Sequence, residues 1–418
     1  MSKEEEGRTM IEQAIAATPT YGSSKRGLPA WTYRNAELLE LEYERVILPS
    51  WQFVCHVNQV KETGAFATLD LMRDSVIVLR GKDGTLRAFS NVCRHRGSKL
   101  LEGAGKCRAR ITCPYHGWSY GLDGSLAATP SEATFPGLDK KQFGLKPIEI
   151  EILMGLVFVR VVGGGPSLKE MWGEYADMLA PFRIEEMVPV AAPTIETWNA
   201  NWKVVTDNNL ENYHVPVGHP GYHRMLDNDL GGFMNKHGVA GSKSILREKL
   251  SSNWSEQRYQ KLAPQALADM PDDSGKTWFF FSMPPNIGID VYPDSMDVFQ
   301  MLPKTAETSL SRYTVLVRPN ETRELRVLRY LNGRINRQVT SEDRTLSERV
   351  QAGLGSHGYE PGPLSTYEYA IHDFHDRIRA ACPVTLLPKA PRAGTLRQRN
   401  EDMLAEADRE ADAMASCP

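Results

Sequence analysis

The pattern of hydrophobic and polar residues changes along the chain, from short strand-like runs to longer helical ones. Over residues 47–165, apolar runs such as SVIVLR and GLVFVRVV alternate with turn sequences such as GKDG and GLDG. Short apolar runs between glycine-containing turns are typical of strands joined by hairpins. The pattern predicts a small antiparallel all-β domain, which ends at Gly163, Gly164, Gly165 and Pro166.

The residues after this boundary mix helical and strand-like patterns. Segments 168–179, 201–214 and 333–354 have the spacing of helices, whereas WFFFSMPP, IGIDVY, MDVFQML and SRYTVLV predict consecutive strands of one sheet. Residues 225–275 are polar and show no clear period. We therefore predict an α+β protein with a larger second domain over residues 166–387, in which an antiparallel sheet packs against helices.

The two ends of the chain have patterns of their own. Residues 1–46 predict a helical or irregular segment that packs on the larger domain. Residues 388–418 are charged and rich in alanine, so they predict a peripheral helix or a partly disordered tail. A length of 418 residues fits two domains, and 41% hydrophobic residues are enough for both cores.

Charge and cysteine content narrow the class of protein. The net charge of −3 favours neither nucleic-acid binding nor a polybasic membrane surface. No apolar run approaches the roughly 20 residues that span a bilayer, and the acidic start MSKEEEGR is not a secretory signal, so we expect a cytoplasmic protein. Six cysteines are too sparse for a disulfide framework, which makes metal binding the first interpretation of paired Cys and His.

The first candidate metal site consists of two short pairs, Cys93 with His95 and Cys113 with His116. Thiolates and imidazoles together suit zinc or an iron–sulfur cluster. Zinc fingers usually pair Cys with Cys and His with His, whereas each pair here holds one of each. In a Rieske centre two His replace two Cys on one iron, which fits this mixture. A structural zinc site is the alternative interpretation.

The segment CRHRG…CPYHGWSYGLDG closely resembles the Rieske domain of ring-hydroxylating and related oxygenases. This resemblance implies one [2Fe–2S] cluster held by Cys93, His95, Cys113 and His116. Cys107 has no partner at ligand spacing, and the adjacent Cys55 and His56 are interpreted as core residues of a strand.

A second candidate site follows about a hundred residues later, at Glu211, His214 and His219. On a helix, Glu211 and His214 would share a face, and a break at Pro216 and Gly218 would let the chain bring His219 back. Two His and one carboxylate form the facial triad of non-haem Fe(II) oxygenases. Glu211 is the carboxylate nearest in sequence.

The family resemblance implies a different carboxylate ligand. In such oxygenases the ligand comes from a later helix, and the matching stretch, residues 341–351, places Asp343 at that position. Glu211 would instead connect a ligand His to a cluster His of a neighbouring subunit. Glu at this position is similar to the subgroup that oxidises quaternary amines. For Glu342 and Glu348 the simpler interpretation is a solvated helix face.

The other motifs are weaker evidence for a functional site. His223 competes with His219, but its spacing fits the family less well, and His372 and His375 are expected to be structural. The sequence GLGSHG at residues 353–358 matches the dinucleotide fingerprint but follows a helix rather than a strand. We therefore expect no nicotinamide or flavin site, so a partner must deliver the electrons.

The resemblance as a whole implies the oxygenase component of a multicomponent Rieske enzyme, with a helix-grip-like catalytic domain. It implies one cluster and one mononuclear Fe(II) per chain, O2 as co-substrate, and NAD(P)H electrons that arrive through a reductase or ferredoxin. It also implies a head-to-tail homotrimer, in which electrons pass from His116 of one subunit through Glu211 of the next. The alternative is a Rieske electron carrier, but the residues after the cluster motif argue against it.

The sequence leaves the substrate open. The predicted sheet carries many aromatic residues, which could line a pocket for an arene, form a cation–π cage for a quaternary ammonium group, or simply fill the core. Hydroxylation and oxidative demethylation therefore both stay possible, and no substrate-binding residue is assigned. The residues concerned are Trp278, Phe279, Phe280, Phe281, Met283, Tyr292 and Phe299.

Overall fold

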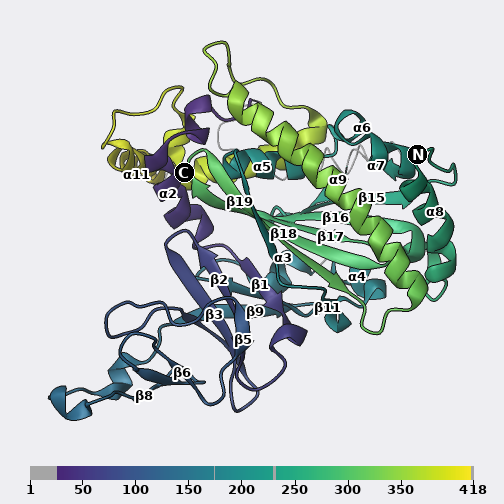
Figure 1. Ribbon diagram of the computed structural model, residues 1–418. Coiled ribbons are helices and arrows are strands. Elements are labelled where there is room, and N and C mark those ends of the chain that lie inside the picture. The colour runs from purple at the N-terminus through teal and green to yellow at the C-terminus, as the bar shows by residue number, and fades with distance from the viewer. Residues whose placement is uncertain (1–25, 174, 229–231, 416–418) are drawn as a thin grey trace. The chain divides into compact units, whose positions relative to one another are not determined.

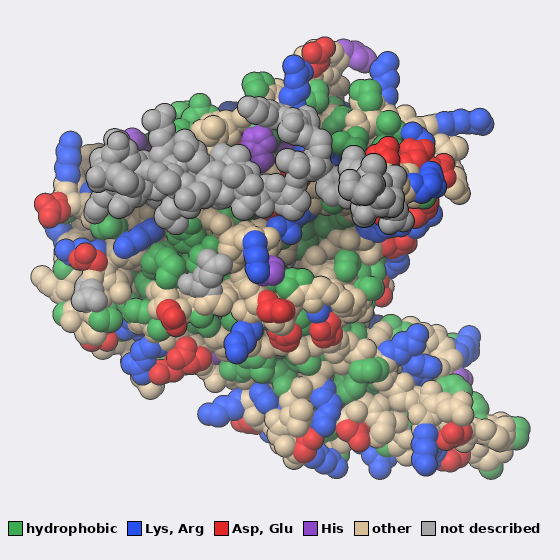
Figure 2. All heavy atoms as spheres, turned by 180° about the vertical axis from the view of Figure 1, so that it is seen from behind, with side chains coloured by type: hydrophobic (Ala, Val, Ile, Leu, Met, Phe, Trp, Pro, Cys, Tyr) green, Lys and Arg blue, Asp and Glu red, His purple; other side chains and the backbone are tan. Residues whose placement is uncertain are grey.

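The computed structural model describes residues 26–173, 175–228 and 232–415, and these residues fold into two compact units (Figure 1). The smaller unit comprises residues 49–193 and 314–319, and the larger unit comprises the other described residues. Acidic and basic side chains intermingle on the face drawn in Figure 2. No helix in the described part of the chain is long and apolar enough to cross a membrane.

The smaller unit is built on two antiparallel sheets, in the orders β1-β10-β9-β4-β3-β2-β5 and β6-β7-β8. The predicted hairpin at GKDG joins β3 to β4, and Gly84 takes the left-handed conformation that this turn needs. The prediction of a small antiparallel β domain is confirmed. The strands are β1 (Gln52–His56), β2 (Ala65–Leu71), β3 (Asp74–Arg80), β4 (Leu86–Ser90), β5 (Ala104–Lys106), β6 (Arg110–Thr112), β7 (Ser119–Gly121), β8 (Leu126–Ala128), β9 (Pro147–Leu153) and β10 (Leu156–Arg160).

The segment after the glycines at 163–165 continues the smaller unit. The amide of Leu168 donates to Glu151 Oε2 over 2.7 Å. Further along, Asn58 Nδ2 donates to the carbonyl of Met187 over 2.8 Å. These bonds hold residues 166–193 in this unit, whereas the sequence pattern placed the boundary at residue 165. The segment contains α3 (Leu168–Trp172), α4 (Ala176–Leu179) and β11 (Val188–Pro189).

The larger unit contains a sheet in the order β19-β18-β17-β16-β15-β13, with β12 beside β19 and β14 beside β15. The four strands predicted from aromatic and β-branched runs are β16 to β19, and they pair antiparallel as expected. The strands are β12 (Thr194–Trp198), β13 (Leu226–Asn228), β14 (Phe233–Met234), β15 (Ala240–Leu246), β16 (Thr277–Met283), β17 (Ile287–Val291), β18 (Ser295–Thr305) and β19 (Thr308–Val317).

A long helix, α9 (Arg323–Gly353), lies across one face of this sheet (Figure 1). It begins ten residues before the predicted start because the side chain of Thr322 caps it, accepting a hydrogen bond from the amide of Leu325. Between Leu328 and Asn336 its buried residues recur every three or four positions, so they form one stripe facing the sheet. The other helices of the unit are α2 (Ala36–Glu42), α5 (Trp202–Asn209), α6 (Val215–Gly218), α7 (Pro220–Met225), α8 (Trp254–Ala266), α10 (Tyr369–Ala381) and α11 (Leu396–Ala415).

Two segments are more ordered than their sequence pattern indicated. The interpretation of residues 225–275 as irregular was wrong, since they contain β13 to β15 and α8. The buried face of α8 includes Glu256 and Gln260, whose hydrogen bonds replace the apolar residues that a periodicity search detects. At the C-terminus α11 is helical, with Leu396 buried in a cluster with residues of α2. Residues 1–25 and 416–418 lie outside the described residues.

A buried ion pair fixes α5, the helix that leads into the second candidate site. Lys203 Nζ lies 2.8 Å from Glu42 Oε1 of α2, and both side chains are almost completely buried. Lys203 also donates to the carbonyl of Thr32, and Trp202 Nε1 donates to Glu42 Oε2. Burial raises the pKa of Glu42, and the neighbouring Lys203 opposes that rise. A charge buried so fully must keep its partner, so the pair holds α5 against α2.

We expect Lys203→Met to lower the free energy of unfolding of the larger unit by about 3 to 5 kcal/mol, because it leaves Glu42 buried without its counter-charge. Denaturant unfolding followed by tryptophan fluorescence would measure the loss. The control is Lys106→Met, which breaks the exposed pair with Glu62 and should leave the free energy of unfolding nearly unchanged. Equal losses in the two variants would contradict this account.

Candidate metal centres

Two loops of the smaller unit have the same backbone shape. In the first, the amide of Gly97 donates to the carbonyl of Cys93 over 3.0 Å, and in the second Gly117 donates to Cys113 over 3.1 Å. Both glycines take positive φ, at 74° and 73°. A side chain at either position would be strained, so glycine lets each loop fold back tightly. Each loop thereby presents one Cys and one His.

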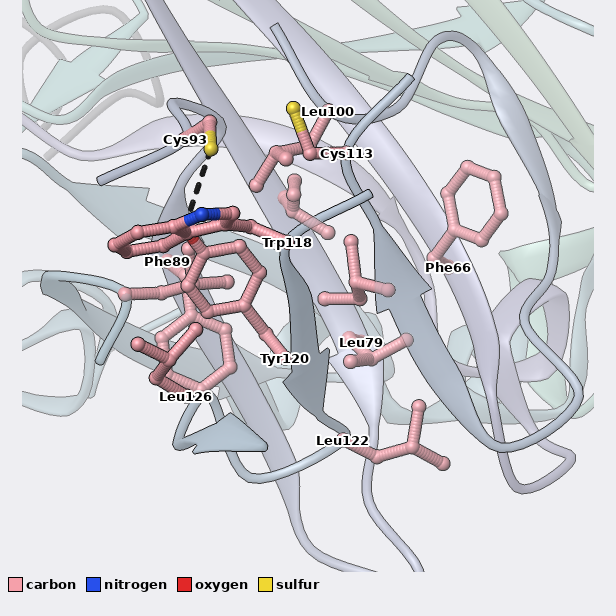
Figure 3. Close-up of a cluster of buried hydrophobic side chains, with 13 residues drawn as sticks. Phe66, Leu79, Phe89, Cys93, Leu100, Cys113, Trp118, Tyr120, Leu122 and Leu126 are labelled. Carbon is pink, nitrogen blue, oxygen red and sulfur yellow. Dashed lines mark hydrogen bonds between the residues drawn. The ribbon is translucent and has the colours of Figure 1, made fainter. Parts of the chain in front are cut away.

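The two cysteine sulfurs lie at one end of the hydrophobic core of this unit (Figure 3). Cys93 and Cys113 are 3% exposed, and Tyr120 Oη lies 3.3 Å from Cys93 Sγ. Burial acts to raise the pKa of Cys113, but hydrogen bonds from the backbone amides of Tyr115 and His116, together with the side chains of Cys93 and Ser98, lower that pKa. Amides directed at the sulfur favour the thiolate, the form that binds metal.

The two histidines of these loops lie nearer the surface. The rings of His95 and His116 are 4.8 Å apart, and the Trp118 ring stacks on His95 at the same centroid distance. His116 is exposed and stacks on Tyr115. Two buried thiols and two outer imidazoles on paired loops are the donor set that a two-iron Rieske cluster requires.

In the larger unit the chain between α5 and α7 differs in detail from the prediction. Helix α5 ends at Asn209, so Glu211 and His214 lie in the connecting turn rather than on one helix. Pro216 does not break a helix but lies in the first turn of α6, where its missing N–H is tolerated. His219 lies between α6 and α7.

His214, His219 and Asp343 nevertheless meet, and one ligand atom from each lies within 4.8 Å of the others. The two Nε2 atoms are 3.1 Å apart, and Asp343 Oδ1 is 3.6 Å from His214 Nε2 and 2.8 Å from His219 Nε2. Ligands at about 2.1 Å from one metal and at right angles are separated by about 3 Å. The three atoms therefore have the spacing of adjacent ligands of a single ion.

The polar groups of this cluster need a cation. Asp343 Oδ1 is buried and makes no hydrogen bond, despite its short distance to His219. Burial acts to lower the pKa of His214, but Asp343 and Glu211 outweigh it and raise that pKa to about 9. The two imidazoles likewise lower the pKa of Asp343 against its burial. The cluster thus attracts positive charge, as a divalent metal site does.

Each of these histidines is also held through its other ring nitrogen by a carboxylate. His214 Nδ1 lies 2.5 Å from Glu211 Oε1, and His219 Nδ1 lies 2.9 Å from Glu342 Oε2. Gln338 Nε2 donates to the other oxygen of Glu342 over 3.0 Å. The interpretation of Glu342 as a solvated residue was wrong. Its position beside Asp343 was the available signal, because carboxylates commonly orient metal-binding histidines.

The remaining candidates lie elsewhere. His223 is exposed on α7, and His375 is buried and lies 2.9 Å from Asp207 Oδ1. Glu348 accepts a hydrogen bond from the amide of Asn199. None of these described side chains joins the cluster of His214, His219 and Asp343.

A cavity of about 110 Å³ opens onto this cluster and is lined in part by all three residues. Phe280, Tyr292 and Phe299 of the predicted aromatic set line it, whereas Trp278, Phe279, Phe281 and Met283 are buried core residues. Sequence periodicity could not separate these groups, because Trp278 and Phe280 share a sheet face. The aromatic residues of the lining are Trp198, Tyr222, Phe280, Tyr292, Phe299 and Tyr313.

Comparisons with known proteins match both units. A family model described as the Rieske [2Fe-2S] domain matches residues 50–144, and one described as the ring hydroxylating alpha subunit (catalytic domain) matches residues 184–383. The chain is 31% identical over 339 residues to the carnitine monooxygenase oxygenase subunit of Acinetobacter pittii, covering 79% of this chain and 87% of that protein. It is 28% identical to the glycine betaine monooxygenase oxygenase subunit of Chromohalobacter salexigens, covering 84% of each.

A solved structure is similar over most of its length. It is a quaternary ammonium Rieske monooxygenase, described in connection with carnitine oxidation and inter-subunit electron transfer. The identity is 27%, the TM-score is 0.71, and the match covers 85% of this chain and 95% of that one.

We expect Glu342→Ala to weaken retention of the mononuclear metal by about 10- to 100-fold, because His219 loses the group that orients its ring. The measurement is iron content per chain after dialysis against graded chelator, with the visible absorbance of the [2Fe–2S] cluster as an internal reference. Glu348→Ala, on the same helix, is the control and should retain iron normally. Unchanged retention in Glu342→Ala would refute the positioning role.

Proposed function

This chain belongs to the Rieske non-haem iron oxygenases, as an oxygenase (alpha) subunit, and we propose that it oxidises a quaternary ammonium compound. It is an oxidoreductase that incorporates oxygen from O2, with a Rieske [2Fe–2S] cluster and a mononuclear iron as cofactors. The alternative of an electron carrier alone is wrong, because the catalytic domain follows the Rieske domain.

We propose that Cys93, His95, Cys113 and His116 hold the cluster, and that His214, His219 and Asp343 hold the mononuclear iron. The observation that supports the iron site is the buried Asp343 Oδ1, which faces two imidazole nitrogens without a hydrogen bond. When bound, the iron supplies the site at which O2 is activated beside the substrate. Glu211 and Glu342 orient the two histidines and keep their Nε2 atoms turned toward one point.

The cavity supports the choice of substrate class. Aromatic side chains line it, and the faces of such rings attract a quaternary ammonium group by cation–π interaction. The relatives named above act on carnitine and glycine betaine, which both carry this group. Oxidation at an N-methyl group would release formaldehyde, whereas hydroxylation elsewhere would leave the amine intact.

We further propose a homotrimer in which electrons cross between subunits. The exposed His116 would contact Glu211 of another subunit, which already touches the iron ligand His214. The related quaternary ammonium monooxygenase is described with inter-subunit electron transfer, which supports this arrangement. A separate reductase would deliver electrons from NAD(P)H to the cluster. Because the cysteines of the described residues are free, we propose a cytoplasmic location.

The substrate class is tested with the iron-loaded chain, a Rieske-oxygenase reductase and NADH. We expect O2 uptake to depend on a quaternary ammonium compound among carnitine, glycine betaine and choline, with the oxidised product identified by mass spectrometry. Naphthalene serves as the neutral aromatic comparison, and Asp343→Asn as the variant without functional iron. Oxidation of naphthalene with none of the three ammonium compounds would contradict the proposal.

The role of Glu211 is tested separately. We expect Glu211→Ala to retain both metal centres, measured as three irons and two acid-labile sulfides per chain, while coupled turnover is nearly abolished. The reason is that the carboxylate between His214 and His116 of the partner subunit would be missing. Glu211→Asp keeps the carboxylate and should recover part of the rate. Normal turnover in Glu211→Ala would exclude the connection.

A further inference from the structure

The cavity beside the candidate iron site contains a carboxyl group that the oxygenase reaction does not require. Asp290, on β17, lines the cavity together with Phe280 of β16, which is its direct cross-strand neighbour. The ring centroid of Phe280 lies 5.9 Å from that of Tyr222 and 6.3 Å from that of Tyr292, and all three residues line the cavity. A carboxyl group within a set of aromatic rings is the combination that best holds an organic cation.

A second carboxyl group lies directly opposite Asp290 in the sheet. Asp297 of β18 is its cross-strand partner, so both side chains project from the same face. The carboxyl group of Asp297 already accepts two hydrogen bonds, since Tyr313 Oη and Asn336 Nδ2 both donate to its Oδ2. Asp290 accepts only a longer bond of 3.3 Å from Tyr292 Oη. The pair places two acids side by side, an arrangement that destabilises a sheet unless something compensates it.

The histidines of the lining already pair with Glu211, Glu342 and Asp343, so they do not compensate Asp290. The lining residues include the carboxyl groups of Glu211, Asp290 and Asp343 but no Lys or Arg. Glu211 and Asp343 already face the two histidines of the iron site. Burial, followed by the nearby Asp297, raises the pKa of Asp290 well above its usual value. A cation bound next to Asp290 would favour its ionised form and remove this cost.

We propose that Asp290 is a specificity-determining residue, which selects a quaternary ammonium substrate that carries no carboxylate. This inference rests on the proposed function and narrows its substrate class. The trimethylammonium group of such a substrate would bind beside Asp290 and the aromatic side chains of the lining. A substrate carboxylate, as in glycine betaine or carnitine, would find carboxyl groups in the lining and no Lys or Arg to pair with. Selection then comes from repulsion as well as attraction.

The experiment measures the binding of small-molecule probes to the iron-loaded protein, in the oligomeric state in which it is isolated. The method is isothermal titration calorimetry without O2. The probes are choline, glycine betaine, and the neutral isostere of choline in which a tert-butyl group replaces trimethylammonium. We expect choline to bind at least about tenfold more tightly than either of the others. Glycine betaine binding as tightly as choline, isostere binding as tightly as choline, or no measurable choline binding would each overturn the proposal.

Two variants test whether the preference for choline depends on the side chain of Asp290. Asp290→Asn keeps the shape and removes the charge, so the dissociation constant for choline should rise about 30-fold or more while that of the isostere stays unchanged. The control is Asp294→Asn, on the same hairpin, whose buried carboxyl group bonds Tyr259 and does not line the cavity. An equal effect of both variants, or an unchanged ratio of choline to isostere affinity in Asp290→Asn, would refute the role of Asp290.

Binding and turnover separate this inference from the proposed function. If glycine betaine is oxidised and binds as well as choline, the proposed function stands and the selection by Asp290 fails. If choline binds in the expected order but no quaternary ammonium compound is oxidised, Asp290 recognises a cation and the proposed function fails.

Discussion

Three electron-pair donors directed at one point are the constraint on which the larger unit depends. His214 and His219 come from the turns after α5, and Asp343 comes from the middle of α9. Bringing them together leaves Asp343 Oδ1 buried without a hydrogen bond, which costs free energy unless a cation is present. The buried ion pair between Lys203 of α5 and Glu42 of α2 fixes the position of α5. Asn332 and Asn336 bond α9 to the β17–β18 hairpin and fix the other side.

The two units serve different steps of one oxidation, and each presents the groups its step requires. The smaller unit buries the thiols of Cys93 and Cys113 away from solvent. It leaves His116 at the surface, where another protein can approach. In the larger unit His214 and His219 each lie against a carboxylate, Glu211 or Glu342, that holds the imidazole in one orientation. Positioning by neighbours matters because a metal site loses affinity when its ligands rotate.

The cavity adds a charge pattern to this chemistry. Glu211 and Asp343 line it beside His214 and His219, and Asp290 lines it beside its cross-strand neighbour Phe280. The described lining contains no Lys or Arg, so the region around Asp290 offers an anionic group no basic side chain to pair with. The same aromatic sheet forms core where its side chains pack together and cavity wall where Phe280, Tyr292 and Phe299 line the cavity.

The sequence alone predicted the antiparallel β unit, the mixed second unit and the candidate Cys and His ligands, because these depend on short-range signals, whereas Asp343 followed only from the family resemblance. Two loops of Cys, His and Gly define their own shape, as Gly97 and Gly117 show by their positive φ. It misplaced the end of α5 and treated Glu342 as solvated, since neither follows from local spacing. Only the tertiary structure decided that Glu342 reaches His219 and that Asp290 faces the cavity. Both depend on helix placement and strand register, which are set by packing between residues far apart in sequence.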